Sequence, residues 1–113
     1  GNDCADFSLG TYNVITANLI NCGDKGISVG EKSNATIKKL EVSTSEIGVA
    51  SKDGSKVLIN DSLISNTNFC LSAYNKKNEF DGGIINVNNF VCKNSNNSTD
   101  IDNYSKIIIK ENI

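Results

Sequence analysis

Two acidic residues, Glu31 and Asp53, lie 22 positions apart in similar surroundings, the first in VGEKS and the second in SKDGS. A third similar phrase, YNKKNE, has Asn75 at the next interval of 22. If residues 22 apart lie on adjacent strands, the two carboxylates are about 5 Å apart, which is the ordinary inter-strand spacing. Retaining glycosidases hold their two carboxyl groups about 5–5.5 Å apart, one as general acid and one as nucleophile. Asp53 and Glu31 are therefore predicted as a candidate catalytic pair.

Basic residues beside these acids allow a second chemistry. Lys52 directly precedes Asp53, and Lys76 directly follows Asn75. A lysine at either place can abstract a proton next to a uronate carboxylate, while Tyr74 protonates the leaving oxygen, as in a polysaccharide lyase. Lys52 is therefore the third candidate catalytic residue. The residues predicted to bind the substrate are Tyr74, Lys76, Lys77 and Glu79.

The same charged phrases are also typical of a solvated edge. Charged residues at a turn between two strands are usually exposed, and the lysines can simply neutralise the carboxylates, each exposed pair contributing about 0–1 kcal/mol. Three interpretations of the phrases stay open: a structural edge, a sugar-binding surface and a catalytic site.

A repeat of 22 residues positions these phrases. Residues 13–33, 35–55 and 57–77 superpose without gaps, and apolar residues alternate with polar ones in short runs, as in strands. Asn, Gly, Asp and Ser separate the runs. Helix is disfavoured, except for a short turn near residues 3–7. The apolar columns of the repeat are Ile15, Ile37 and Ile59; Ile20, Val42 and Ile64; and Ile27, Val49 and Leu71.

The repeat predicts an all-β fold, a right-handed parallel β-helix (solenoid) of about four to five short turns in a single domain, residues 1–113. A leucine-rich repeat would need its own leucine frame, and a propeller blade needs about 40 residues or more. Handedness follows from the chirality of parallel crossovers. The predicted repeats are 13–33, 35–55, 57–80, 84–105 and a partial repeat at 106–113, and the absence of Met predicts a fragment of a longer chain.

The fourth repeat departs from the simple period. Ile85 and Val87 are expected to take the places of Val57 and Ile59. The polar segment 94–105 has no apolar period and is expected to form an exposed loop. Its Asp100 and Asp102 offer alternating oxygen ligands, which makes Ca²⁺ a candidate ligand; no other metal or cofactor is predicted.

Composition excludes several functions. Without His, Ser-His-Asp and Cys-His catalytic arrangements are impossible within this chain. A net charge of −2 gives no overall field for nucleic acid, and no apolar run is long enough to span a bilayer. The four cysteines form no C-x-x-C pair, which disfavours a zinc ribbon. Their spacing leaves three disulfide pairings open, and small buried free thiols are the favoured interpretation.

The runs GDKGISVGEKSNATI, SEIGVASKDGSKVLI and LSAYNKKNEFDGG resemble the right-handed parallel β-helix, pectin-lyase-like superfamily, in particular the carbohydrate-binding and sugar-hydrolysis repeats of secreted or surface proteins of microbes. The resemblance covers residues 13–94. It implies extracellular polysaccharide binding or processing. The acid motifs of polygalacturonases and the arginine of pectate lyases are absent from this sequence, so neither activity transfers directly.

The leading prediction is a polysaccharide-binding β-helix domain of a secreted or cell-surface protein. The alternatives are a glycoside hydrolase or polysaccharide lyase active on acidic glycans, and a structural or adhesive stalk without catalysis. Because repeat arrays need capped ends for solubility, association of copies through exposed solenoid ends is also expected.

Overall fold

The computed structural model describes residues 2–113 and is built from strands. Alternation of apolar and polar residues, without helical periodicity, favours this outcome. The strands are β1 (Ala5–Ser8), β2 (Thr11–Ile20), β3 (Lys25–Gly30), β4 (Asn34–Lys52), β5 (Lys56–Tyr74), β6 (Ile84–Lys93), β7 (Asn97–Ile101) and β8 (Lys106–Asn112).

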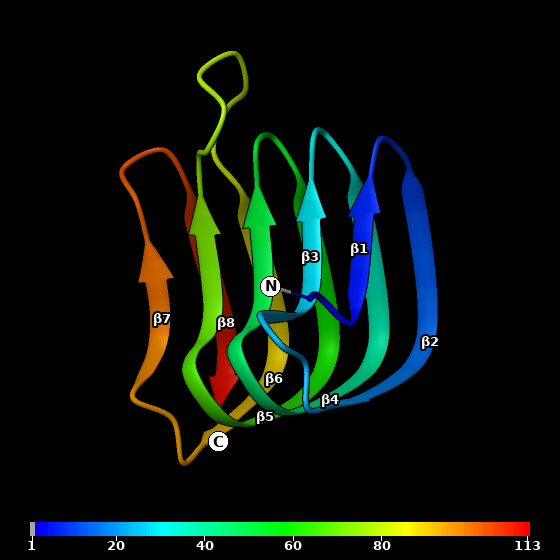
Figure 1. Cartoon of the computed structure of the whole chain (residues 1–113), viewed down its shortest axis with the longest axis vertical. Helices are drawn as coiled ribbons and strands as arrows, with labels where there is room; N and C mark the ends of the chain where they lie inside the picture. The colour runs from blue at the N-terminus through cyan, green and yellow to red at the C-terminus, as the bar shows by residue number, and fades with distance from the viewer. Residues whose placement is uncertain (1) are drawn as a thin grey trace.

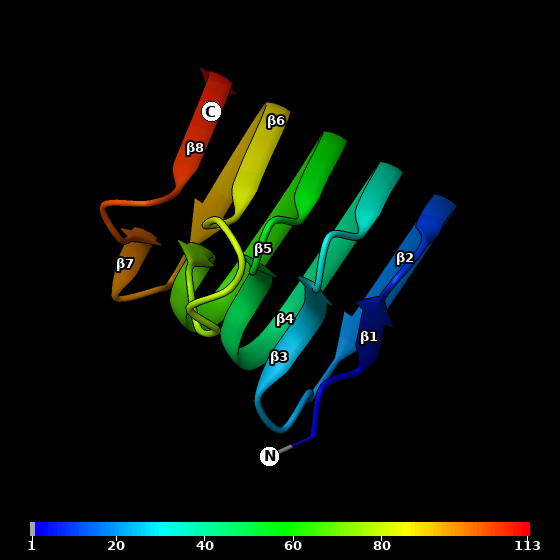
Figure 2. The same cartoon turned by 90° about the horizontal axis from the view of Figure 1, so that it is seen from above.

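All strand pairings are parallel, and they join the chain into a β-solenoid of about five turns (Figures 1 and 2). Strands β4 and β5 pair over their whole length with an offset of 22 residues, so that Ile37 lies beside Ile59. In the next turn Ile85 and Val87 lie beside Val57 and Ile59, as predicted. The predicted fold class is therefore confirmed.

Each turn runs through two layers. The front layer contains β1, β3, residues 45–52 of β4, residues 67–74 of β5, and β7. The back layer contains β2, residues 34–43 of β4, residues 56–65 of β5, β6 and β8. The chain rises in the front layer, descends in the back layer and advances from right to left in Figure 1, which is a right-handed winding.

The bend between the layers recurs at one residue in a left-handed backbone conformation. In β4 and β5 it is Thr44 (φ 67°) and Asn66 (φ 58°), and Asn21 and Asn94 have similar values at the equivalent corners of the first and fourth turns. Asn tolerates this conformation better than other non-Gly residues, which explains its place here.

The core lies between the layers and is made of apolar columns. Ile37, Val42, Ile59 and Ile64 are completely buried. Burial of a branched aliphatic side chain contributes about 1.5–3 kcal/mol, and each column repeats that contribution from turn to turn. At the N-terminal end the rings of Phe7 and Tyr12 stack with centroids 4.5 Å apart and cover the core.

Two predicted column members of the first turn are wrong. Strand β2 pairs with β4 at an offset of 23, so Val14 and Leu19 occupy the columns assigned to Ile15 and Ile20. Ile15 and Ile20 are 71% and 60% exposed. The reason is that the connection before β2 has two residues, whereas the equivalent connection before β4 has three.

Two local predictions are also wrong. The segment near residues 3–7 is not a helical turn, because residues 5–8 form β1. The segment 94–105 is not a continuous loop, because residues 97–101 form β7 and pair with β5. The extra residues of the fourth repeat lie earlier, in the nine-residue connection 75–83 that replaces the three-residue turn 53–55.

The expectation of free thiols is wrong as well, since the four cysteines form the disulfides Cys4–Cys22 and Cys70–Cys92. Position 70 is equivalent to Gly48 one turn earlier. A Cβ on Gly48 would lie 2.6 Å from Cγ2 of Ile64, and Cys92 is the residue paired with Ile64 in the next turn. The disulfide Cys70–Cys92 therefore lies where the preceding turn has the contact between Gly48 and Ile64. Disulfides persist in oxidising compartments, so the two bridges favour an extracellular or otherwise oxidising environment.

Residues 2–113 contain no helix with the length and hydrophobicity that crossing a bilayer would require.

Candidate functional site

The predicted charged column is present at the upper edge of the solenoid in Figure 1, where the front strands end. The amide of Lys32 donates to the carbonyl of Asp53 at 3.0 Å, and the amide of Asp53 donates to the carbonyl of Tyr74 at 3.3 Å. Glu31, Asp53 and Asn75 thus occupy equivalent turn positions, which is the register on which the prediction depended. Glu31 (φ 51°) and Asp53 (φ 56°) both have the left-handed backbone conformation of a tight turn.

Asp53 does not face solvent. Its side chain is completely buried, and its Oδ1 accepts hydrogen bonds from the amides of Lys76 at 2.7 Å and Lys77 at 2.8 Å. Its Oδ2 has no hydrogen-bond partner within the described part of the chain, residues 2–113. The carboxylate holds the start of the connection 75–83 against the solenoid.

The other two predicted catalytic residues lie nearer the surface. Glu31 Oε1 accepts a hydrogen bond from Lys77 Nζ at 2.9 Å, and this bond and the charge of Glu31 raise the pKa of Lys77. Lys52 lies beside Tyr74 in the strand register, and its side chain extends over Gly30. The assignment of Asp53, Glu31 and Lys52 as catalytic residues stays a prediction.

The predicted substrate-binding residues divide into two groups. Lys76, Lys77 and Glu79 lie on the exposed connection 75–83, whereas Tyr74 is half-buried. Burial raises the pKa of the Tyr74 hydroxyl, partly offset by the positive charge of Lys25. A phenol whose pKa is raised holds its proton at neutral pH, as a proton donor requires. Sugar binding by these four residues stays a prediction.

A second carboxylate, that of Asp102, also holds the connection 75–83 in place. Asp102 Oδ2 accepts a hydrogen bond from the amide of Asn75 at 2.6 Å, while its Oδ1 accepts from the Tyr104 amide at 3.0 Å and the Ser105 hydroxyl at 2.7 Å. Asp100 accepts a hydrogen bond from the Ser72 hydroxyl at 3.1 Å. Residues 2–113 contain no group of three or more Cys, Asp or Glu side chains placed to hold a metal ion.

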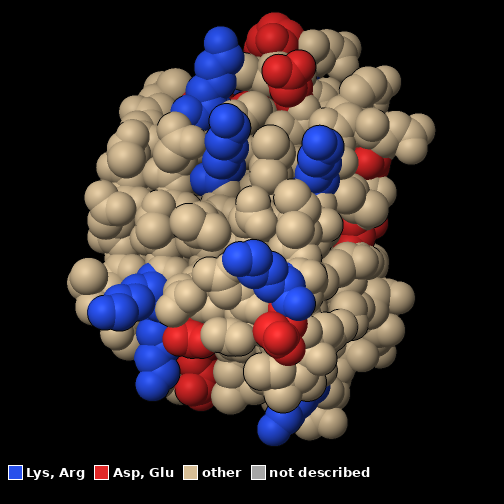
Figure 3. All heavy atoms as spheres, turned by 180° about the vertical axis from the view of Figure 1, so that it is seen from behind, with Lys and Arg blue, Asp and Glu red and all other residues tan. Residues whose placement is uncertain are grey.

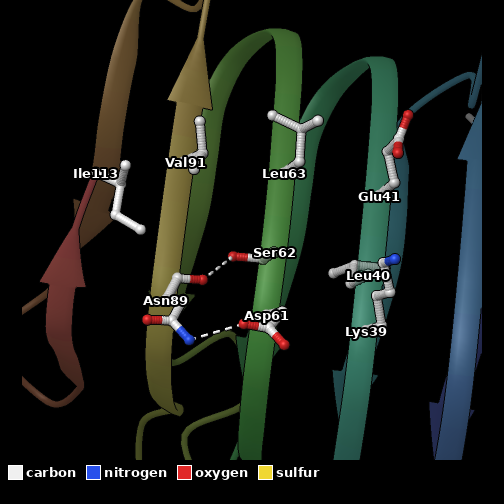
Figure 4. Close-up of a pocket in the computed structure, with 9 residues that line it drawn as sticks. All are labelled: Lys39, Leu40, Glu41, Asp61, Ser62, Leu63, Asn89, Val91 and Ile113. Carbon is white, nitrogen blue, oxygen red and sulfur yellow. Dashed lines mark hydrogen bonds between the residues drawn. The ribbon is translucent and has the colours of Figure 1, made fainter.

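A groove lies elsewhere, on the outer side of the back layer (Figure 4). It has a volume of about 250 Å³, and none of the predicted site residues lines it. Its lining residues are Lys39, Leu40, Glu41, Asp61, Ser62, Leu63, Asn89, Val91 and Ile113. They come from β4, β5, β6 and the C-terminal residue, so the groove runs across the strands and along the solenoid axis.

The groove arises from a break in the strand alternation. Residues 38–39 in β4 and 60–61 in β5 are consecutive exposed positions, and residues 88–89 in β6 are both half-buried. The sequence signal was therefore available, as the doublets KK, ND and NN at equivalent positions of three repeats.

The two walls of the groove differ in chemistry. One wall is a polar row in which Lys39 lies beside Asp61 and Asp61 beside Asn89. The Asn89 amide donates to Asp61 Oδ1 at 2.7 Å. The other wall begins at Glu41 and continues as an apolar row of Leu63, Val91 and Ile113. The buried Leu40 and Ser62 lie between the two rows (Figure 4).

Lysines dominate the charge of the back layer, on which the groove lies. The segments of the back layer carry six lysines and three carboxylates, a net charge of +3, whereas the rest of the chain carries five lysines and ten carboxylates. All six lysines are exposed, and the salt bridges among residues 2–113 involve only Lys25 and Lys77. Figure 3 shows lysine side chains spread over this face, with acidic side chains among them. They are Lys38, Lys39, Lys56, Lys93, Lys106 and Lys110.

Comparisons with known protein families, with curated proteins and with solved structures found no match. The strand pairings by themselves establish the parallel β-solenoid, and membership of the pectin-lyase-like superfamily stays a prediction.

Proposed function

We propose that this chain is a carbohydrate-binding β-helix domain of a secreted or cell-surface protein, and that it holds an acidic polysaccharide along the groove of its back layer. The observation that supports the proposal is the groove itself, which has a polar row on one wall and lies on a layer with six exposed lysines that form no salt bridge among residues 2–113. On this proposal the sugar lies on the back layer, away from the turn residues that the sequence favoured.

The geometry of the groove suits an extended polymer of sugar units. Its polar row presents one side chain on every turn, at the inter-strand spacing of about 4.8 Å, which is comparable with the length of one sugar unit. Lys39, Asp61 and Asn89 together offer hydrogen-bond donors and acceptors for hydroxyl groups. The apolar row of Leu63, Val91 and Ile113 offers a surface for the C–H faces of sugar rings.

The charge of the back layer favours a polymer that carries carboxylates or sulfates. The net charge of +3 on this layer contrasts with −2 for the whole chain, so the excess of positive charge belongs to the back layer, on which the groove lies. Exposed charges act within about 10 Å at 0.1 M salt, so binding is expected to weaken as the salt concentration rises. The two disulfides support an oxidising environment for the same domain.

Affinity electrophoresis in gels containing polygalacturonate tests the proposal. We expect the double variant Lys38→Ala/Lys39→Ala to bind roughly ten-fold more weakly than the wild type, since two exposed charge contacts contribute about 1.4 kcal/mol together. The matched control Lys52→Ala/Lys76→Ala removes the same charge from the turn edge and is expected to retain wild-type binding.

Each other outcome is informative. Loss of binding only in the Lys52→Ala/Lys76→Ala variant would return the site to the turn edge. Unchanged mobility of the wild type across a broad panel of acidic and neutral glycans would contradict carbohydrate binding altogether.

A structural role is the second candidate function, and the contacts of Asp53 and Asp102 favour it for the turn edge. Both carboxylates accept main-chain hydrogen bonds that position the connection 75–83. On this proposal the chain is a spacer or adhesive segment without catalysis. Scrambling Lys52, Lys76 and Glu79 would then change neither glycan binding nor any hydrolytic or lyase activity.

A further inference from the structure

The two ends of the solenoid expose strand edges and incompletely covered core residues. Strands β1 and β2 at one end, and β7 and β8 at the other, each pair with a single neighbour. The apolar side chains that cover the core at the ends are only partly buried, among them Tyr12 and Val14 at the N-terminal end and Ile107 and Ile109 at the C-terminal end. Ile101 of β7 is 48% exposed.

The register makes these ends complementary. Tyr12 and Ile107 belong to one column, with Ala35, Val57 and Ile85 between them. A second copy stacked head-to-tail would set Ile107 of one molecule on Tyr12 of the next, as consecutive turns do inside the chain.

Two further columns continue across such a contact in the same way. Ile109 would lie on Val14, and Ile101 would lie on Phe7. All three contacts join apolar side chains, so the stacked copies would extend the apolar core from one molecule into the next.

One column opposes this contact. Its members are Asp6, Ser28, Ala50, Ser72 and Asp100, from successive turns of the front layer. The three inner members are small and buried, whereas the two end members are acidic and exposed. Head-to-tail stacking would place Asp100 of one copy directly opposite Asp6 of the next. Like charges directly opposite on neighbouring strands are destabilising.

Neither carboxylate forms a salt bridge among residues 2–113. The lysines that form salt bridges among residues 2–113 are Lys25, with Asp3 and Asp24, and Lys77, with Glu31. The Ser72 hydroxyl holds Asp100 Oδ2 at 3.1 Å, which keeps this carboxylate in the column. Charged side chains on exposed edges are a recognised way in which proteins prevent edge-to-edge pairing.

We propose that the two ends of the solenoid are a self-association surface for a second copy of this chain, and that repulsion between Asp6 and Asp100 holds this head-to-tail contact open at neutral pH. The proposal does not rest on carbohydrate binding, although the contact includes β8, which carries Lys106 and Lys110 of the back layer. A heterologous contact of this kind does not close and therefore builds linear chains of copies.

Charge reversal tests the proposal, with mass measured by sedimentation and particle shape by small-angle scattering. The wild type is expected to be monomeric. Asp100→Lys alone is expected to associate into rods that lengthen with protein concentration, because an acid on one copy then faces a lysine on the next. Asp6→Lys alone is expected to do the same. The double variant Asp6→Lys/Asp100→Lys restores like charges and is expected to be monomeric again.

The single variants and the double variant together separate charge pairing from non-specific effects. Both residues are exposed, and circular dichroism checks that each variant keeps its strands. A monomeric Asp100→Lys variant at all concentrations would overturn the proposal. So would association of the double variant to the same extent as the singles, a wild type that already forms rods, or particles that grow side by side rather than lengthwise.

Discussion

At the residue scale, the acidic side chains of the turn edge act mainly as hydrogen-bond acceptors for the main chain. Asp53 accepts two amides of the connection 75–83, and Asp102 accepts a third. Asn75 donates its side-chain amide to the carbonyls of Lys77, Phe80 and Asp81 and fixes the same connection from within. Residue types suited to acid–base chemistry therefore have a definite structural use here.

Asp102 makes the stability of the chain depend on pH. Burial acts to raise the pKa of its carboxyl, but the hydrogen bonds from Asn75, Ser105 and Tyr104 outweigh burial and lower the pKa. A carboxyl whose pKa is depressed by folding stabilises the protein above its unfolded pKa, and this contribution is lost as the pH falls through the folded pKa. The free energy of unfolding of Asp102→Asn is therefore expected to fall less than that of the wild type between about pH 5 and pH 2.

Urea unfolding at a series of pH values measures this difference. Asp81→Asn, a change at an exposed acid of the same connection, is the matched control and is expected to follow the wild-type profile. Identical profiles for Asp102→Asn and the wild type would show that Asp102 does not contribute through its charge.

At the element scale, the solenoid depends on close contact between strands at the inner corner of each turn. Gly26 and Gly48 occupy this corner in β3 and β4, and in β5 the equivalent Cys70 is bonded to Cys92. A Cβ at Gly48 would meet the Cys70 carbonyl oxygen at 2.5 Å and Ile64 at 2.6 Å. Backbone and a buried side chain cannot both move away, so glycine is required at this position.

Gly48→Ala is accordingly expected to lower the free energy of unfolding by about 1–3 kcal/mol, the usual cost of overpacking a core. Gly30→Ala is the matched control, because its added Cβ would meet only the flexible side chain of Lys52, at 3.0 Å. Denaturant unfolding of both variants measures the difference. If both variants lost the same free energy of unfolding, the contact at the corner would not be the reason that Gly48 is required.

At the scale of the whole molecule, the turns at the two ends of the solenoid are expected to be less stable than the turns in the middle. Strands β4 and β5 pair over 19 residues each and have neighbours on both sides, whereas β7 and β8 have a neighbour on one side only. In repeat proteins the free energy of unfolding is close to the sum of the stability of each repeat and the contribution of each contact between neighbouring repeats. The N-terminal turn is additionally held by Cys4–Cys22 and by the stacked rings of Phe7 and Tyr12.

Hydrogen exchange is expected to follow this order. Amides of residues 35–42 and 57–64 should exchange slowest, and those of β7 and β8 should exchange first, through local opening. Mass spectrometry of peptides after timed exchange measures the gradient. Uniform protection from β1 to β8 would show instead that the solenoid opens only as a whole.

Much of the architecture followed from the sequence. The alternation of apolar residues and the period of 22 predicted strands, parallel stacking and the pairing of Ile37 with Ile59. Errors occurred where connection length, rather than composition, sets the register. A turn shorter by one residue moved Val14 and Leu19 into the columns expected for Ile15 and Ile20, since shifting a strand by one residue turns every side chain to the other face.

The candidate site was less predictable. Sequence placed Glu31, Asp53 and Asn75 in one column, but burial of Asp53 depends on how the connection 75–83 folds back over it. The groove combines three strands and the C-terminal residue, and no local phrase contains all of them. The disulfide pairing likewise depended on which corners of the turns coincide.

The sequence by itself determined the β-solenoid, because a repeated pattern of apolar and polar residues can bury its apolar face only by stacking turn upon turn. Only the tertiary structure decided which acids are buried, where the surface is hollowed and which lysines surround the hollow. These properties arise between turns, from the lengths of the connections and the break in the strands of the back layer, and they are therefore properties of the assembled stack.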